Sequence, residues 1–416
     1  MRPEQLSDAL GHLSEKTLEE TATLRENPKS THKTSHRNLI FRFGELAVCL
    51  ALVLFAGFKL LPLLQGEEPV SGELPLLTMV EESFGEGGVG GETYYAFDIS
   101  ELTNANPWTP DAKLSTLPVY KNSVTHNDNH QLQGGDFDKM RELLLDVAKR
   151  LGLDTETLSI SDDVPSAYQQ AVITEKFGGN VPEGYFDPTA LKTKTDGVTI
   201  EVDATLTAKI TFDPAIPLPE KYNFEEYAPY EDVEQAANYL KKEFRSLLNM
   251  KKPTLNLYAG GYNINFGMHY YTEFFEGKGN LTEQIINYNF NRVHFACSED
   301  TGLWLARVYQ PDLSQKLGDY PLLSVEEAIG LLMEGNCYTT HSCEVPGEEY
   351  IAKVELMYRT GEYEEYFMPY YRFYVELPDY EYAPVGSDGI KSYGIFYVPA
   401  VKTEYISNLP AAVERG

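Results

Sequence analysis

The feature that most constrains this chain is an apolar run of nineteen residues near its start, from Leu46 to Leu64. Lys59 is the only charged residue in the run, and it lies near the C-terminal end of the run together with Pro62. A helix of about 20 apolar residues crosses the roughly 30 Å hydrocarbon core of a bilayer, and a lysine near its end can extend to the headgroups. A buried core helix is the alternative, but nothing upstream could cover it on all sides. We therefore predict a transmembrane helix over residues 45–65, with membrane lipid around residues 46–64.

The charges on either side of the run predict its orientation. Five basic residues and one acidic residue lie between Leu24 and Gly44. Glutamates from Glu67 to Glu86 follow the run, and no lysine or arginine occurs before Lys113. Because positive residues stay on the cytoplasmic side, we expect a single-pass protein of the cell membrane with a cytoplasmic N-terminus and an extracytoplasmic C-terminal part.

A cleaved signal peptide is the main alternative to this anchor. Its charged region would be about forty residues long, whereas a whole signal peptide has about 15–30 residues. A lipidated cysteine ends its apolar stretch, but Cys49 lies near the beginning of this one. We therefore predict an uncleaved signal-anchor.

The charge balance bears on which partners are compatible with the exterior part. The chain has 34 lysines and arginines against 63 aspartates and glutamates, a net charge of −29. The basic residues near the membrane balance the acidic ones there, so the excess lies beyond the apolar run. A surface this acidic repels a phosphate backbone, and we expect no nucleic-acid partner.

A chain of 416 residues is too long for one ordinary domain and should carry two or three. Its exterior part shows amphipathic helices followed by strand-like runs, which favours an α+β fold with repeated helix-on-antiparallel-sheet modules. We predict a cytoplasmic amphipathic stub and basic tether (1–44), the transmembrane helix (45–65), an acidic, flexible, glycine-rich linker (66–92), and three helix-plus-sheet modules (93–228, 229–318 and 319–410).

Three helices carry the clearest signals. The first is expected over residues 136–151, where Asp136 can cap an apolar stripe, and the second over residues 231–249. The third begins with a capping box formed by Ser324 and Glu327 and ends at Gly335. Strands are expected after each helix, including runs at 285–296 and 303–309.

The exterior cysteines and histidines offer weak candidates for a site. Cys337 and Cys343 bracket a short loop; chance placement, a disulfide and a zinc site all fit, although a fourth zinc ligand is missing. His126 and His130 lie in an Asn/Asp-rich stretch that favours a surface loop over a metal site. No nucleophile motif or phosphate loop occurs. We therefore expect no enzyme, catalytic residue, cofactor or metal, and a hydrolase is only a third alternative.

Aromatic residues are abundant in the second half of the chain, which has 29 tyrosines and 20 phenylalanines in all. The densest run contains a ligand-platform candidate formed by Tyr370, Tyr371, Arg372 and Tyr374. Such rings suit a glycan or a protein partner. The other interpretation, which we favour, is that alternating tyrosines supply β-propensity and cover a sheet.

The C-terminal segment carries a resemblance to a known family. Residues 319–328, 348–358 and 368–373 match a helix start, a strand that ends in tyrosine and a following strand with a Pro-x-Tyr-Arg-like pattern. Residues 317–406 thereby resemble the extracytoplasmic YycH/YycI-type regulators of low-GC Gram-positive bacteria. The resemblance implies single-pass, outward-facing proteins with helix-plus-sheet modules related to PepSY domains.

Most of the chain also resembles a group of uncharacterised single-pass clostridial membrane proteins. The shared segments are at the N-terminus and at residues 104–108, 117–122, 287–291 and 397–406. The cytoplasmic stub looks like those of some anti-sigma-factor-like proteins. Neither resemblance implies a catalytic residue.

These observations favour a non-enzymatic sensor or regulatory accessory that binds a protein or envelope ligand outside the membrane. A membrane histidine kinase or a sigma factor would then be its partner inside. The alternative is a cell-surface module that binds wall glycan or peptide without signalling.

Overall fold

The computed structural model describes residues 74–80, 93–126, 132–133, 135–181, 184–222, 228–263, 267–298, 302–339, 344–378 and 389–409. The chain divides into units at 1–71 and 72–416, and all described residues belong to the second. The predicted stub, tether and span lie outside the described residues. In the part of the chain that the structure does describe, no helix is long and apolar enough to cross a membrane.

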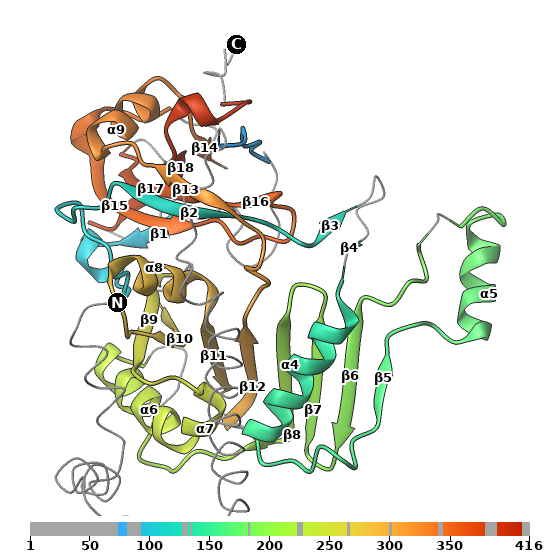
Figure 1. Cartoon of the computed structure of the whole chain (residues 1–416). Coiled ribbons are helices and arrows are strands. Elements are labelled where there is room, and N and C mark those ends of the chain that lie inside the picture. Colours follow the sequence, from blue (N-terminus) through green and yellow to red (C-terminus); the bar gives the residue numbers. More distant parts are fainter. Residues whose placement is uncertain are drawn as a thin grey trace, which may run out of the picture. The chain divides into compact units, whose positions relative to one another are not determined.

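The larger sheet of this unit has eight antiparallel strands in the order β5-β6-β7-β8-β12-β11-β10-β9 (Figure 1). It consists of two groups of four strands, which meet where β8 pairs with β12. The strands are β5 (Ile160–Asp162), β6 (Ala190–Thr195), β7 (Val198–Asp203), β8 (Thr207–Ile216), β9 (Pro253–Tyr262), β10 (Met268–Glu276), β11 (Arg292–Ser298) and β12 (Gly302–Tyr309).

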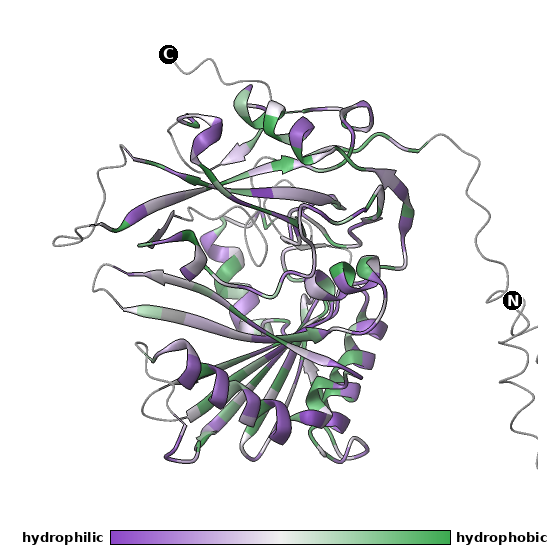
Figure 2. Cartoon of the chain, turned by 90° about the vertical axis from the view of Figure 1, so that its left-hand side faces the viewer, coloured by the Kyte–Doolittle hydropathy of each residue, from purple (hydrophilic) through white to green (hydrophobic). Residues whose placement is uncertain are grey.

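Each four-strand group follows an amphipathic helix that packs on it. Helix α4 (Phe137–Arg150) contacts β6–β8 and is capped by Asp136, as predicted. Helix α6 (Tyr230–Glu243) contacts β9 and β10, and α7 (Arg245–Leu248) continues it after a break at Phe244. The apolar stripes of these helices and the facing strand residues form one hydrophobic core. Figure 2 shows helices that carry both hydrophobic and hydrophilic residues.

Two further helices lie where the sequence patterns did not indicate them. Helix α5 (Ala167–Lys176) has no clear apolar stripe in its sequence, and none of its residues is buried. Helix α8 (Leu281–Phe290) occupies part of the predicted strand at 285–296, and that prediction is wrong for its first half. A capping box of Asn280 and Glu283 begins α8, and β11 starts only after it ends.

The second sheet joins both ends of the described chain. Its order is β1-β18-β17-β15, with β14 also paired to β18, and α9 (Val325–Met333) contacts β18. The predicted capping box of Ser324 and Glu327 begins α9. The strands are β1 (Thr93–Ala96), β14 (Tyr338–Thr339), β15 (Ile351–Tyr358), β17 (Pro369–Glu376) and β18 (Lys391–Pro399).

A smaller sheet of three strands has the order β13-β2-β16, with β2 (Thr116–Lys121) between β13 (Lys316–Pro321) and β16 (Tyr366–Phe367). A short hairpin of β3 (Thr125–His126) and β4 (Leu132–Gln133) follows β2 in the chain. The described residues thus confirm the predicted α+β class, with antiparallel pairing between the strands.

The strand pairing corrects the predicted division into modules with sheets of their own. The boundary between residues 228 and 229 falls inside the eight-stranded sheet, because β8 and β12 pair across it. Strands β1 and β2, assigned to the first module, pair with β18, β13 and β16 of the later ones. The physical reason is that edge hydrogen bonds are satisfied by partners distant in sequence, which a local pattern does not identify.

The prediction that residues 66–92 form a flexible linker is also wrong for residues 74–80. Leu77 forms a parallel bridge with Ile406, and its side chain is fully buried. Met79 is buried in the same cluster. The glycine-rich residues that indicated flexibility follow this segment and lie outside the described residues.

Candidate functional site

The predicted ligand platform on β17 is not a surface. Tyr370, Tyr371 and Tyr374 are buried, and the hydroxyl of Tyr371 donates a hydrogen bond of 2.7 Å to the carbonyl of Leu323. Arg372 donates to the carboxylate of Glu355. These side chains therefore pack both faces of the second sheet, in agreement with the structural interpretation of the tyrosine pattern and against a platform for ligand.

The other candidates from the sequence fall partly outside the described residues. Cys337 is half-buried after α9, but Cys343 lies outside the described residues, so the disulfide stays a prediction. His126 belongs to β3, and its ring stacks on Tyr363 at 4.0 Å between centroids. His130 also lies outside the described residues. Among those that are described, no group of three or more His, Cys, Asp or Glu side chains could hold a metal ion.

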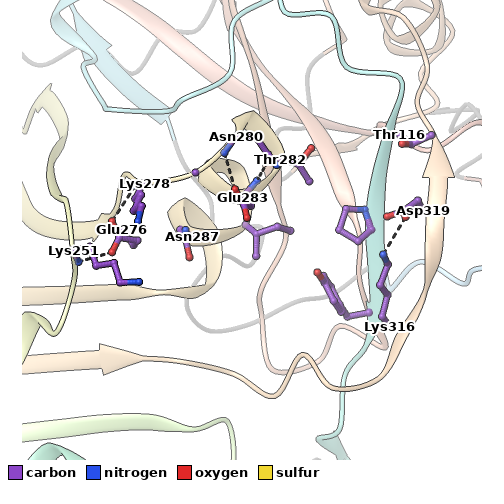
Figure 3. A pocket seen from close by; sticks show the side chains of 14 residues that line it. Thr116, Lys251, Glu276, Lys278, Asn280, Thr282, Glu283, Asn287, Lys316 and Asp319 are labelled. Carbon is purple, nitrogen blue, oxygen red and sulfur yellow. Dashed lines mark hydrogen bonds and ion pairs between the residues drawn. The ribbon is translucent and has the colours of Figure 1, made fainter. Parts of the chain in front are cut away.

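A groove with a volume of about 860 Å³ lies between α8 and the small sheet (Figure 3). Polar and apolar side chains both line it. Its lining comes from three separate segments of the chain, within residues 116–120, 251–287 and 316–319. The lining residues are Thr116, Pro118, Tyr120, Lys251, Glu276, Lys278, Gly279, Asn280, Thr282, Glu283, Ile286, Asn287, Lys316 and Asp319.

One wall of the groove is organised by Glu276 at the end of β10. Its carboxylate accepts backbone hydrogen bonds from Lys251 at 2.6 Å, Lys252 at 2.9 Å and Lys278 at 3.0 Å. Burial acts to raise the pKa of Glu276, but these three N–H donors outweigh it and lower the pKa. The carboxylate thus fixes the backbone of the two loops that present Lys251 and Lys278, whose side chains are exposed.

The floor of the groove is the first turns of α8. Glu283 accepts from the backbone N–H of Asn280 at 2.7 Å, and Asn280 accepts from that of Glu283 at 2.9 Å. This capping box satisfies the N–H groups of Asn280 and Glu283, so fewer donors at the start of the helix remain for an anion. Asn287 lies further along the groove in Figure 3.

The opposite wall is formed by β2 and β13. Thr116, Pro118 and Tyr120 alternate along β2, so they lie on the same face of the strand. On β13, Lys316 and Asp319 form an ion pair of 3.0 Å. This wall is a strand surface with one aromatic ring, and it suits an extended ligand.

The charges in the groove differ from those of the whole chain. Three lysines and three carboxylates line it, so it is close to neutral in a chain of net charge −29. The carboxylates are engaged by backbone N–H groups or by Lys316, as described above. Within the described residues, the ammonium groups of Lys251 and Lys278 make no hydrogen bond or ion pair. The groove can therefore offer two cations to the acidic groups of a ligand.

A smaller cleft of about 210 Å³ lies beside β7, β8 and β12. Asp203 and Glu362 both line it, and burial raises the pKa of each. At Asp203 the hydrogen bonds from Thr205 and Thr207 oppose burial without outweighing it, and at Glu362 the charge of Asp203 adds to burial. Asp203 also accepts hydrogen bonds from Thr205 and Thr207, which close the turn between β7 and β8. These bonds give Asp203 a structural role, and the cleft is therefore the weaker candidate.

The segment at 104–108, which the sequence singled out, does not line the groove. The backbone N–H of Ala105 donates to Asn256 on β9 at 2.8 Å, and the amide of Asn104 donates to Glu355 on β15 at 2.5 Å. Asn106 donates to the carbonyl of Leu356 at 3.0 Å. The segment thus ties the eight-stranded sheet to the second sheet, which is a structural function.

No model of a known protein family matches the chain, and no curated protein matches it in sequence.

Proposed function

We propose that this chain is a membrane-anchored extracytoplasmic protein, a sensor or regulatory accessory, whose groove binds an extended segment of another envelope protein. The observation that carries the proposal is the groove itself, with a strand surface on one side and, on the other, the exposed Lys251 and Lys278, which form no ion pair with the described residues. Anchoring rests on the apolar run at 46–64 and the charges beside it. The proposal includes no catalytic step.

The finer family assignment is also a proposal. Helix α4 with β5–β8, and α6 and α7 with β9–β12, repeat the order of a helix followed by four antiparallel strands. This repetition is in keeping with the PepSY-like modules that the YycH/YycI resemblance implies. We propose that the partner inside the cell, a histidine kinase or a sigma factor, is engaged through residues 1–44.

Binding of glycan without signalling is the alternative. Sugars are commonly held by stacking on exposed aromatic rings. Tyr120 is the one aromatic residue among the described residues that line the groove, and its ring also packs against Phe290 at 6.2 Å between centroids. The groove chemistry therefore favours a peptide with acidic side chains over a glycan.

Photo-crosslinking in the native host tests the binding site. A photoreactive residue at Asn287, in the groove, is expected to capture a discrete envelope partner, whereas one at the exposed Tyr168 on α5 is not. Lys251→Glu combined with Lys278→Glu should lower the yield of partner crosslinked at Asn287 at least tenfold, because the charge at both positions is reversed. The matched control is Lys176→Glu with Lys242→Glu, two exposed lysines outside the groove.

Equal capture from Asn287 and Tyr168, or an unchanged yield in the groove variant, would exclude this groove as the binding site. Adducts with glycan strands in place of protein would favour the alternative. Circular dichroism of each variant establishes that the fold is retained.

Deletion of residues 1–44 ahead of the apolar run separates signalling from adhesion. Because the proposed contact with a kinase or sigma factor lies in this part, we expect changed transcription with unchanged crosslinking at Asn287. The measurement is the transcript profile of the deletion strain against wild type. An unaltered profile contradicts the signalling role and leaves the groove as a binding site only.

A further inference from the structure

A short segment near the start of the described chain, the strap (residues 74–80), is bound to the rest of the fold like a peptide ligand. The backbone N–H of Leu77 donates to the carbonyl of Tyr405 at 2.8 Å, and the N–H of Ser407 donates to the carbonyl of Leu77 at 2.8 Å. The side-chain amide of Asn408 donates to the carbonyl of Met79 at 2.8 Å and accepts from its N–H at 2.7 Å. This is the pattern by which an added strand binds at an exposed edge.

The side chains of the strap alternate between the core and solvent. Leu77 is 0% exposed and packs with Met79 against the cluster that contains Tyr320 and Ile406, whereas Leu76 is 60% exposed. The hydroxyl of Tyr320 donates to the carbonyl of Pro75 at 2.9 Å. The strap therefore has two buried anchors and a row of backbone bonds, which together specify its register.

Two further contacts join the strap to the loop between β15 and β16. The hydroxyl of Thr78 donates to the carboxylate of Glu365. The guanidinium of Arg359 donates to the carbonyl of Val80 at 3.4 Å. Thr78 is exposed, and Val80 is the last residue of the strap. These two polar contacts therefore supplement the buried anchors Leu77 and Met79 without burying more apolar surface.

We propose that the strap is a separable strand, which the fold binds as an intramolecular ligand and whose release lengthens the tether to the preceding chain. With the strap bound, ten residue steps separate Leu64 from Leu74, a reach of at most about 35 Å. With the strap released, the steps from Leu64 to Thr93 allow about 100 Å. The change in distance from a bilayer rests on the proposed anchoring at 46–64, whereas the separability of the strap does not.

Cutting the full-length chain on the C-terminal side of the strap tests the proposal. A specific protease site is placed between Gly87 and Gly88, and the tagged chain is purified in detergent and cleaved. The two fragments are expected to elute together in size-exclusion chromatography, because the contacts of the strap replace the broken link. Leu77→Asp should release the N-terminal fragment, because a buried anchor becomes charged. The amount of N-terminal fragment that elutes with the C-terminal fragment should fall at least a hundredfold.

Leu76→Asp is the matched control, because it places the same charge on the exposed neighbour and should leave the fragments together. Asn408→Ala covers the case in which Leu77→Asp does not fold: Asn408 is exposed, and loss of its two bonds to Met79 should speed fragment release about tenfold or more. An excess of synthetic peptide with the sequence of residues 74–80 should displace the fragment, and the same peptide with Asp at position 77 should not.

Separation of the wild-type fragments immediately on cleavage overturns the proposal. Equal retention in wild type, Leu77→Asp and Asn408→Ala overturns it as well, because other contacts would then hold the fragments together. Neither result depends on a ligand in the groove. A failure of the strap proposal can therefore be told apart from a failure of the proposed function.

Discussion

Replacement of Glu355 by glutamine is expected to lower the free energy of unfolding by about 3–5 kcal/mol, the range for breaking one partner of a buried ion pair. Glu355 on β15 is buried, where Lys353 lies 2.7 Å from one carboxylate oxygen and Arg372 bonds to the other. The hydroxyl of Tyr374 also donates to it, at 3.3 Å. Glutamine has nearly the same shape but leaves the charges of Lys353 and Arg372 without their carboxylate.

The same carboxylate predicts how this difference depends on pH. Burial acts to raise the pKa of Glu355, but the charges of Arg372 and Lys353 and the hydrogen bonds outweigh it and lower the pKa to about 2, against an ordinary value of 4.5. A lowered pKa stabilises the fold above the unfolded value. The contribution, about 3 kcal/mol, is lost as the pH falls from about 4.5 to about 2.

Urea unfolding of the purified chain, followed by the fluorescence of the buried Trp108, measures both effects. The gap between wild type and Glu355→Gln should be largest near pH 7 and should narrow steadily below pH 4.5. Glu376→Gln is the control, because Glu376 pairs with Lys391 at an exposed position, 2.8 Å apart, and such pairs contribute about 0–1 kcal/mol. Equal losses in the two variants, or a gap independent of pH, would contradict the role assigned to Glu355.

Sequence patterns predicted the elements whose signals are local. Asp136 followed by an apolar stripe gave α4, and Ser324 with Glu327 gave α9, because a cap and a stripe lie within one helix. Helix α8 was missed although Asn280 and Glu283 form the same capping box. Its residues from Ile285 to Phe290 alternate in a way that imitates a strand, so the available signal was the cap and not the periodicity.

The groove and the strap could not be predicted from such signals, because both depend on partners distant in sequence. Thr116 on β2 and Asn287 on α8 face one cavity only after β2 has paired with β13. Leu77 and Met79 alternate over too few residues to stand out among the surrounding glutamates. The tyrosines of β17 can be recognised in the sequence. Whether each ring faces solvent or the core depends on what packs over the sheet, which the local pattern does not indicate.

Replacement of Arg359 by methionine is expected to have an effect as large as that of Glu355→Gln, about 3–5 kcal/mol in the free energy of unfolding. The side chain of Arg359 is completely buried, and its guanidinium lies 2.7 Å from the buried carboxylate of Glu364. The rings of Tyr338 and Tyr370 lie at 5.3 Å and 5.2 Å from it. Methionine fills a similar volume but leaves the charge of Glu364 in an apolar setting.

A double-mutant cycle separates the ion pair from packing. Glu364→Leu alone should be about as harmful as Arg359→Met, because it leaves a buried cation uncompensated. The double variant should recover most of the loss, since replacing both partners of a buried pair by apolar residues is often close to neutral. Additive losses in the double variant would instead show that the two side chains act independently.

The cycle also bears on the strap, because Arg359 donates to the carbonyl of Val80 as well as pairing with Glu364. In the cleaved chain, the double variant should keep its stability yet release the N-terminal fragment faster than wild type. Its core is neutral again, but the donor to Val80 is gone. Such a result would separate two functions of the Arg359 side chain. One is to neutralise the buried carboxylate of Glu364, and the other is to hold the strap.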